Sequence, residues 1–166
     1  MLSAVAMAAC VRAASVAWST GSLYAPNADG SLSSSRLSGT WGTYNVVVNF
    51  YADNAGAMGA AIAGVTGNTD TTASLGNFSG TTSDSFTGES SYWAQVVVTA
   101  TSKGENPTTY TMTSDAVKFT APVNGAFSLN FSNQGAMPDT WDVPEPTSGL
   151  LLLLGVAGLA LKRKRA

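Results

Sequence analysis

The chain has 166 residues, of which 45% are hydrophobic and 11% charged, and its formal net charge is −2. It contains no histidine, and its one cysteine is Cys10. These counts exclude an internal disulfide, a zinc site built from Cys and His, and a histidine-based catalytic triad. Because side chains that transfer protons near neutral pH are scarce, we expect no enzymatic activity, no cofactor and no metal ion.

Charge is unevenly distributed along the chain. Residues 14–143 hold three basic side chains against nine acidic ones, a net charge of −6, whereas the end of the chain carries a basic block formed by Lys162, Arg163, Lys164 and Arg165. A stretch of about 130 residues is long enough for one domain with its own core. Since this acidic stretch offers no basic face, nucleic acid is excluded as a partner.

The first 13 residues are apolar and rich in alanine, as in a secretory signal peptide. Leu2–Val11 forms the hydrophobic region, and small side chains after it predict cleavage before Ala14. No lysine or arginine precedes the hydrophobic region, so we expect the true start codon to lie farther upstream. Alternatively, Met7–Cys10 resembles a lipoprotein box, in which Cys10 would become a lipidated first residue.

Short strands separated by turn residues follow in the first half of the chain. Ser15–Trp18 predicts the first strand, and Ala25–Gly30 has the residue types of a turn. Tyr44–Tyr51 alternates at period two, so its larger side chains share one face of a strand. Those side chains are Tyr44, Val46, Val48 and Phe50. Residues 57–66 could form a helical turn or a strand, and the β-rich context favours a strand.

The second half contains the most regular pattern. Gly67–Ser91 is dominated by small polar residues and holds only short elements. Tyr92–Thr101 alternates cleanly and is followed by a loop at Lys103–Pro107, which predicts the first arm of a hairpin. The second arm lies at 110–113 and 116–120. Ala126–Phe131 predicts the last strand.

Six or seven short strands with turn signals about every ten residues predict an all-β fold, a small antiparallel β-sandwich over residues 14–132. Phe86–Tyr92, followed by alternating valines, resembles the entry to the sixth strand of the immunoglobulin-like fibronectin type III domains, and Ser114–Pro122 resembles their closing strand. Gly88 stands where that family usually has proline. The resemblance implies that Tyr92 places its hydroxyl on the preceding turn as a tyrosine corner; otherwise Tyr92 is simply a β-former on a half-buried strand.

Outward aromatic and acidic side chains are the candidates for binding. Trp93 points away from Tyr92 on the same strand, so if Tyr92 faces the core, Trp93 lies outward or in the second layer. It is a possible saccharide contact, because a flat apolar ring matches the CH face of a pyranose. The alternative is that Trp93 only packs on the sheet. Asp53-Asn54 and Asp139–Asp142 carry oxygens that calcium prefers, but no calcium-loop motif is present, so we interpret them as solvated turn residues.

The end of the chain has consecutive parts with different chemistry. After a predicted linker at 133–143 comes Pro144-Glu145-Pro146, whose prolines keep the backbone extended. An apolar stretch at 149–161 and the basic block follow. A helix of that length rises about 20 Å against roughly 30 Å of bilayer hydrocarbon, so we predict a short membrane helix that snorkelling of the basic stems assists. Its main apolar side chains are Leu150, Leu151, Leu152, Leu153, Leu154, Val156, Leu159 and Leu161.

Residues 144–166 resemble the PEP-CTERM sorting signal of Gram-negative bacteria. The resemblance implies that an exosortase recognises Pro144, Glu145 and Pro146, and that the basic block stops the helix and stays in the cytoplasm. It further implies an exported protein, anchored in the inner membrane by its helix and then passed to the cell envelope, the cell surface or the extracellular space. An ordinary tail-anchored or single-pass segment is the alternative.

The PEP-CTERM resemblance also implies a role in the cell envelope or the extracellular matrix, where exopolysaccharide is a candidate partner. We therefore expect a non-enzymatic structural or adhesive module. Carbohydrate binding by the sandwich, through Trp93, is the alternative function.

Overall fold

Residues 13–66, 76–82 and 86–144 are described by the computed structural model, and the regular elements within them are strands. In chain order these are β1 (Ala13–Ser22), β2 (Tyr24–Pro26), β3 (Leu32–Arg36), β4 (Gly42–Asn54), β5 (Ala57–Thr66), β6 (Asn77–Thr81), β7 (Phe86–Thr87), β8 (Ser91–Ser102), β9 (Thr109–Thr113), β10 (Val117–Thr120) and β11 (Ala126–Asn130).

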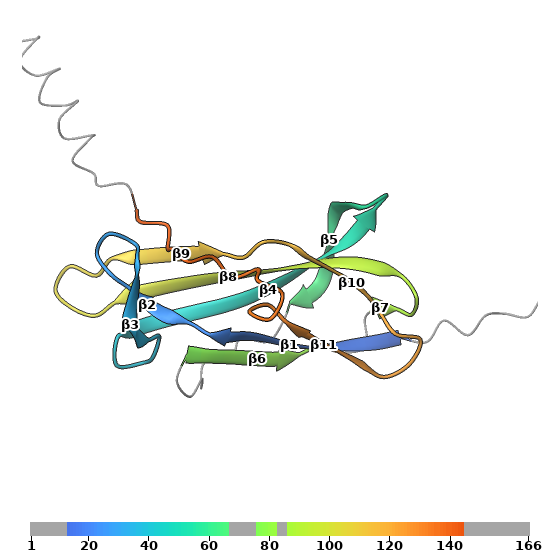
Figure 1. Ribbon diagram of the computed structural model, residues 1–166, viewed down its shortest axis with the longest axis horizontal. Coiled ribbons are helices and arrows are strands. Elements are labelled where there is room, and N and C mark those ends of the chain that lie inside the picture. Colours follow the sequence, from blue (N-terminus) through green and yellow to red (C-terminus); the bar gives the residue numbers. More distant parts are fainter. Residues whose placement is uncertain (1–12, 67–75, 83–85, 145–166) are drawn as a thin grey trace, which may run out of the picture.

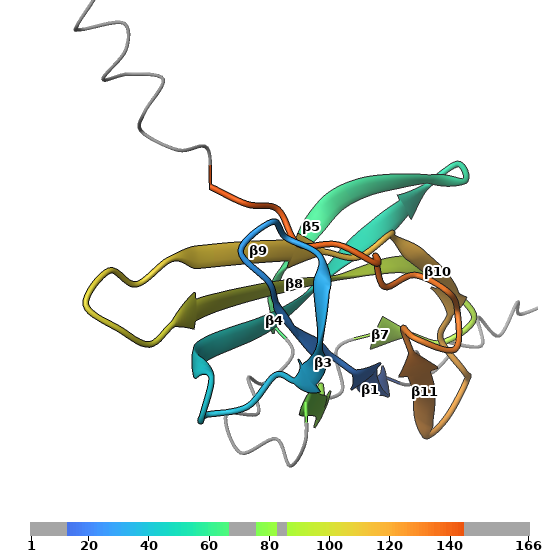
Figure 2. The same ribbon diagram turned by 60° about the vertical axis from the view of Figure 1, so that its left-hand side comes forward.

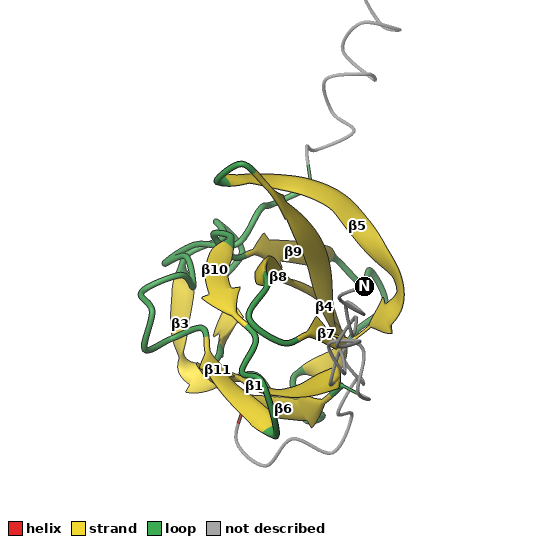
Figure 3. Cartoon of the chain, turned by 90° about the vertical axis from the view of Figure 1, so that its right-hand side faces the viewer, coloured by secondary structure: helices red, strands yellow, loops and turns green. Residues whose placement is uncertain are grey.

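Two larger sheets face each other (Figure 1, Figure 3), and β2 and β3 form a separate two-stranded sheet. One sheet has the order β10-β8-β4-β5, with β9 also paired to β8, and its pairs are antiparallel. The other has the order β11-β1-β6, with β7 paired to β1. The hairpin of β2 and β3 stands across one end of the two layers (Figure 1). The predicted all-β class is confirmed, and the two-layer arrangement is that of a β-sandwich.

One strand pair departs from the antiparallel arrangement that we expected. β11 runs parallel to β1, from Ser15 opposite Ala126 to Ser19 opposite Asn130. The two strands come from opposite ends of the sandwich sequence, so no tight turn forces them to run antiparallel. The expectation of a purely antiparallel sandwich is therefore wrong for this pair.

The long central strands β4 and β8 supply much of the core. Their ladder runs from Gly42 opposite Ser102 to Ala52 opposite Tyr92. Of the side chains predicted to share one face of β4, Val46, Val48 and Phe50 are buried and Tyr44 is half-buried. The alternate side chains of β8 are buried as well, at Ala94, Val96, Val98 and Ala100. Each buried Val or Phe side chain stabilises the fold by about 1.5–3 kcal/mol relative to exposure. The period-two pattern thus identifies the two strands at the centre of the sheet.

The opposite sheet contributes Trp18 to the core. This side chain is 2% exposed and comes from β1, at the position paired with Gly80 of β6. A Cβ atom at Gly80 would lie 2.8 Å from two ring carbons of Trp18. The missing side chain of Gly80 is therefore what allows the indole to lie against the neighbouring strand.

Aromatic rings fill the core beside the start of β8. Phe86, Tyr92 and Phe119 pack with ring centroids 5.0 to 5.8 Å apart. Phe119 also stacks on Phe127 of the opposite sheet at 5.4 Å. The Tyr92 hydroxyl accepts a hydrogen bond from Thr87 N–H at 2.9 Å. This is the hydrogen bond that a tyrosine corner predicts, so Tyr92 ties β8 to the turn before it.

Three buried hydroxyl side chains lie where strand pairing is interrupted. Between β9 and β10, Ser114 N–H donates to the Val96 carbonyl oxygen and Ser114 Oγ accepts from Val96 N–H, both at 2.9 Å. Between β6 and β7, Thr82 makes the same two hydrogen bonds with Val16, again at 2.9 Å. Thr20 bonds the β6 backbone at the bulge in β1. An unpaired buried backbone group costs about 1–3 kcal/mol, so these hydroxyls let strand pairing break at low cost.

β4 and β5 are joined by a two-residue turn. Ala55 and Gly56 have φ angles of 52° and 93°, the left-handed values that a type I′ hairpin turn requires at both central positions. The strand predicted at 57–66 is confirmed as β5, and the helical alternative is wrong. Figure 2 shows this hairpin projecting from the sandwich.

Candidate functional site

The candidate site is the junction between the sandwich and the sorting tail. Pro144 is the last residue that the structure describes, and it is exposed. Glu145, Pro146, the membrane segment at 149–161 and the basic block at 162–165 lie outside the described residues, and so do residues 1–12 of the predicted signal peptide, which include Cys10. The predicted cleavage position, before Ala14, falls at the start of β1. In the part of the chain that is described, no helix has the length and apolar character needed to cross a bilayer.

Residues 133–143, which we call the strap, follow a tight turn after β11. Asn130 organises this turn, because its side-chain oxygen accepts a hydrogen bond from Asn133 N–H at 3.0 Å. Gly135 adopts a left-handed φ of 65°, and the next residue, Ala136, makes a backbone hydrogen bond to the sandwich. The segment predicted as a linker therefore begins with a defined turn.

The strap lies along the outer edge of β9 and of the link between β9 and β10. Asp115 N–H, in the link between these strands, donates to the Ala136 carbonyl oxygen at 2.8 Å. Asp142 N–H donates to the Thr111 carbonyl oxygen at 2.7 Å, and Thr111 N–H donates back to the Asp142 carbonyl oxygen at 3.3 Å. Figure 2 shows the strap, in orange, passing beside β9. Open edge strands invite pairing with other chains, so the strap protects this edge.

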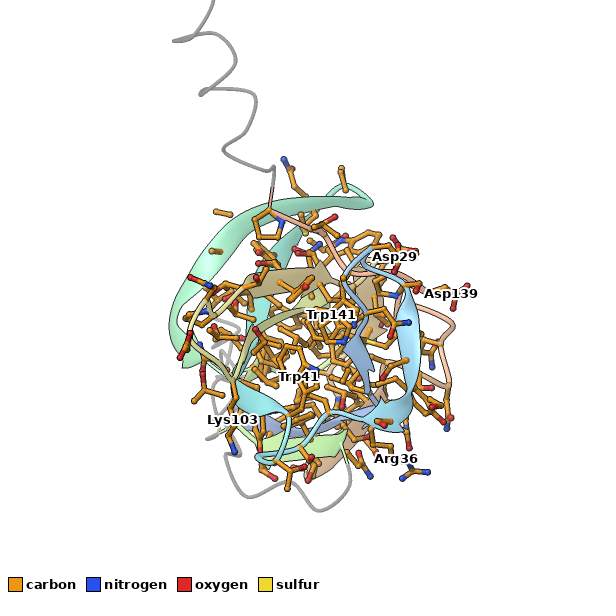
Figure 4. The ribbon with its side chains drawn as sticks, turned by 90° about the vertical axis from the view of Figure 1, so that its left-hand side faces the viewer. Asp29, Arg36, Trp41, Lys103, Asp139 and Trp141 are labelled. Carbon is orange, nitrogen blue, oxygen red and sulfur yellow. The ribbon has the colours of Figure 1, made fainter. Side chains whose placement is uncertain are left out.

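Trp141 fixes the C-terminal part of the strap. Its side chain is 3% exposed, and Nε1–H donates to the Tyr24 carbonyl oxygen of β2 at 3.1 Å. Its backbone N–H donates to the Gly30 carbonyl oxygen at 2.7 Å. Figure 4, viewed from this end of the molecule, places Trp141 among the packed side chains. We call residues 140–142 the clasp, because they connect the β2–β3 hairpin to β9.

The loop between β2 and β3 is shaped to receive the clasp. Asp29 Oδ1 accepts hydrogen bonds from Ser31 Oγ at 2.7 Å and from Ser31 N–H at 3.0 Å. These hydrogen bonds, the side-chain one first, hold the pKa of the Asp29 carboxyl below its ordinary value. Gly30 has a φ of 83°, and a Cβ atom there would lie 2.5 Å from the Trp141 carbonyl oxygen. Glycine is therefore needed where the loop meets the clasp.

The chain leaves the sandwich directly after the clasp. Asp142 has both its N–H and its carbonyl oxygen hydrogen-bonded to Thr111, whereas Val143 is 41% exposed. The tripeptide Pro144-Glu145-Pro146 thus begins two residues beyond Asp142. The start of β1 and the end of the described chain lie toward opposite ends of the long axis of the sandwich (Figure 1). The two ends of the described chain therefore lie far from each other.

Trp93 faces outward from the five-stranded sheet, on the opposite side from the buried Ala94. Its Nε1–H donates to Asp53 Oδ1 at 2.7 Å, and Lys118 Nζ lies 3.0 Å from the same oxygen. The bond from Lys118 and then the bond from Trp93 lower the pKa of the Asp53 carboxyl. Lys118 Nζ also lies 5.6 Å from the centroid of the Trp93 ring. Asp53 thus accepts the hydrogen bond of the indole N–H, and Lys118 lies near the ring. Saccharide contact at Trp93 stays a prediction.

The sequence did not reveal the clasp or its receiving loop. Trp141 is one visible signal in the sequence, since it is the largest apolar side chain of segment 133–143. The sequence indicates a turn at Gly30, but no local pattern indicates that Gly30 contacts Trp141. The structure brings these two residues together and leaves Trp93 with different neighbours, Asp53 and Lys118.

One protein-family model matches the chain, and its description is PEP-CTERM protein-sorting motif. The match covers residues 142–165 and confirms that the end of the chain carries this sorting motif. No curated protein and no solved structure matches the chain. The matched segment begins at Asp142, the last residue of the clasp, so the motif overlaps the end of the folded sandwich by one residue.

Proposed function

We propose that this chain is an exported protein whose PEP-CTERM motif delivers it to an exosortase, and that its sandwich is a non-enzymatic module of the cell surface or extracellular matrix. The family match over residues 142–165 carries the proposal. A PEP-CTERM motif implies sorting machinery of the exosortase type as a partner. The position of the motif supports this role, because the tripeptide begins just outside the hydrogen-bonded sandwich.

Each part of the tail has a separate task in this proposal. Pro144 and Pro146 keep the recognition tripeptide extended, because each fixes φ and lacks an N–H donor. Glu145 supplies the one charge of the tripeptide. The apolar stretch at 149–161 anchors the chain in the inner membrane before processing, and the basic block at 162–165 holds the C-terminus on the cytoplasmic side.

A structural or adhesive role suits the sandwich because the described side chains buried between its sheets serve packing and backbone pairing. The inward faces of β4 and β8 carry apolar side chains, and the polar residues buried between the described strands are hydroxyls that bond the backbone. Such a module acts through its surface. Because its sequence is acidic, with a net charge of −6 over residues 14–143, we expect basic or neutral partners.

Carbohydrate binding is the second candidate function. Trp93 lies directly across from Tyr51 on the outward face, and Gln95 lies directly across from Asn49. Two aromatic side chains beside two amides offer a flat apolar surface next to hydrogen-bonding groups. Pull-down of extracellular polysaccharide from the native host with the wild-type chain and with Trp93→Ala tests this candidate. Retention that does not depend on Trp93 would count against it.

Mass spectrometry of the mature protein from its native host tests the sorting proposal. The wild-type protein should lack Ala166 and the basic block and should end near Pro146. Glu145→Ala removes the charge of the tripeptide and should leave full-length protein, whereas Glu105→Ala, in the exposed loop after β8, should be processed as the wild type is. A wild-type protein that retains Ala166 would rule out processing.

A further inference from the structure

We propose that the clasp, residues 140–142, sets how closely a sorting enzyme can approach its motif, so that this distance limits the processing of the folded chain. The inference rests on the proposed function. It assigns a positioning role to Trp141, which lies outside the sorting tripeptide and is buried in the sandwich.

The tether between the sandwich and the motif is short. The backbone N–H and the carbonyl oxygen of Asp142 are both hydrogen-bonded to Thr111. The three residue steps from Asp142 to Glu145 span at most about 10 Å when extended. A domain of about 130 residues has a radius of gyration of roughly 14 Å. An enzyme that binds Glu145 must therefore work within one domain radius of the sandwich surface.

Opening the clasp would lengthen this tether without changing the motif. The next upstream anchor is the Ala136 carbonyl oxygen, which accepts a hydrogen bond from Asp115 N–H at 2.8 Å, and Ala136 is buried. The nine residue steps from Ala136 to Glu145 span about 30 Å when extended. The tether is therefore about threefold longer when the clasp is open than when it is closed.

Trp141 is the residue that keeps the clasp closed. It contributes a buried ring and hydrogen bonds to the Tyr24 and Gly30 carbonyl oxygens, at 3.1 and 2.7 Å. The neighbouring Thr140 and Asp142 are exposed and contribute only backbone pairing. Shortening the Trp141 side chain removes the ring and the indole donor, but it leaves the upstream anchor at Ala136 in place.

The test is the rate of processing of the full chain in its native host, followed by pulse-chase labelling. A four-residue Gly-Ser insertion between Val143 and Pro144 adds about 14 Å of reach and keeps the clasp intact. The same insertion between Gly104 and Glu105, in the exposed loop after β8, is the matched control. We expect the first insertion to accelerate processing several-fold and the control to leave the rate unchanged.

Trp141→Ala tests the clasp without adding residues. It should also accelerate processing, and faster hydrogen exchange at the Asp142 amide should accompany the change while the Val96 amide in the central strand stays protected. Trp141→Phe keeps a ring in place and should fall between Trp141→Ala and the wild type. If Trp141→Ala does not fold, the insertion after Val143 still decides the question.

The outcomes separate this inference from the proposed function. Processing at the wild-type rate in the insertion after Val143 overturns the inference alone, because distance is then not limiting. Slower processing in Trp141→Ala, with the sandwich still folded, also overturns it, because the clasp would then assist the enzyme. A wild-type chain that is never processed overturns the proposed function, and this inference with it.

Discussion

Replacing Thr82 with valine exchanges one buried hydroxyl for a methyl group of nearly the same size. In the wild type, Thr82 Oγ1 accepts a hydrogen bond from Val16 N–H at 2.9 Å. Thr82 is 5% exposed and Val16 is fully buried. The substitution keeps the Thr82 backbone bond to the Val16 carbonyl oxygen and leaves the Val16 N–H without an acceptor. It therefore isolates the contribution of one hydroxyl at a strand break.

The magnitude follows from two opposing terms. A buried amide donor left unpaired costs about 1–3 kcal/mol. The added methyl group returns at most about 0.8 kcal/mol of apolar burial. We expect the free energy of unfolding to fall by roughly 1–2 kcal/mol. For a domain of this size that loss lowers Tm by about 5–10 °C.

The assay is thermal unfolding of the purified full-length chain in mild detergent, followed by near-ultraviolet circular dichroism. Thr82→Ser keeps the acceptor oxygen and should unfold closer to the wild type than Thr82→Val does. Thr113→Val makes the same change at an exposed position of β9 and should unfold within about 2 °C of the wild type. A wild-type Tm for Thr82→Val would refute the role assigned to the hydroxyl.

Three further substitutions test other parts of the fold by the same unfolding assay. Gly80→Ala places a Cβ atom 2.8 Å from ring carbons of Trp18 and should cost about 1–3 kcal/mol, whereas Gly39→Ala, with open space around it, should change Tm little. Ala55→Asn gives the β4–β5 turn a residue that tolerates its left-handed φ of 52° and should raise Tm. Asp53→Asn should lower Tm at neutral pH, and the difference should shrink below about pH 4, because a depressed carboxyl pKa stabilises the fold only while the group is ionised.

The strands that the sequence predicted best are those with the longest alternating patterns. Residues 92–101 and 44–51 became the paired centres of β8 and β4, because one inward face of each strand is covered by the opposite sheet. The sequence pattern did not predict β3 (Leu32–Arg36), which consists mostly of small polar residues and lies at the surface. An exposed strand without alternation leaves no period-two signal to read.

The break between β9 and β10 shows a second limit of prediction from the sequence. The sequence placed strands at 110–113 and 116–120, and the structure has both on one edge of β8. It could not show that Ser114 bonds Val96 across the break, because a serine between two strands reads as an ordinary turn residue. Whether such a hydroxyl is solvated or buried depends on which strands pair on either side of it.

The residue pattern alone predicts the all-β class, the alternating faces of the central strands and the sorting motif at the end of the chain. These are local properties, since alternation and a linear motif can be read from neighbouring residues. The attachment of the segment before the motif to the sandwich, through Trp141, depends instead on how the two sheets pack in three dimensions. The indole of Trp141 meets the Tyr24 carbonyl oxygen across 117 positions of the chain. No local pattern encodes which distant backbone group a side chain will reach once the two sheets have packed.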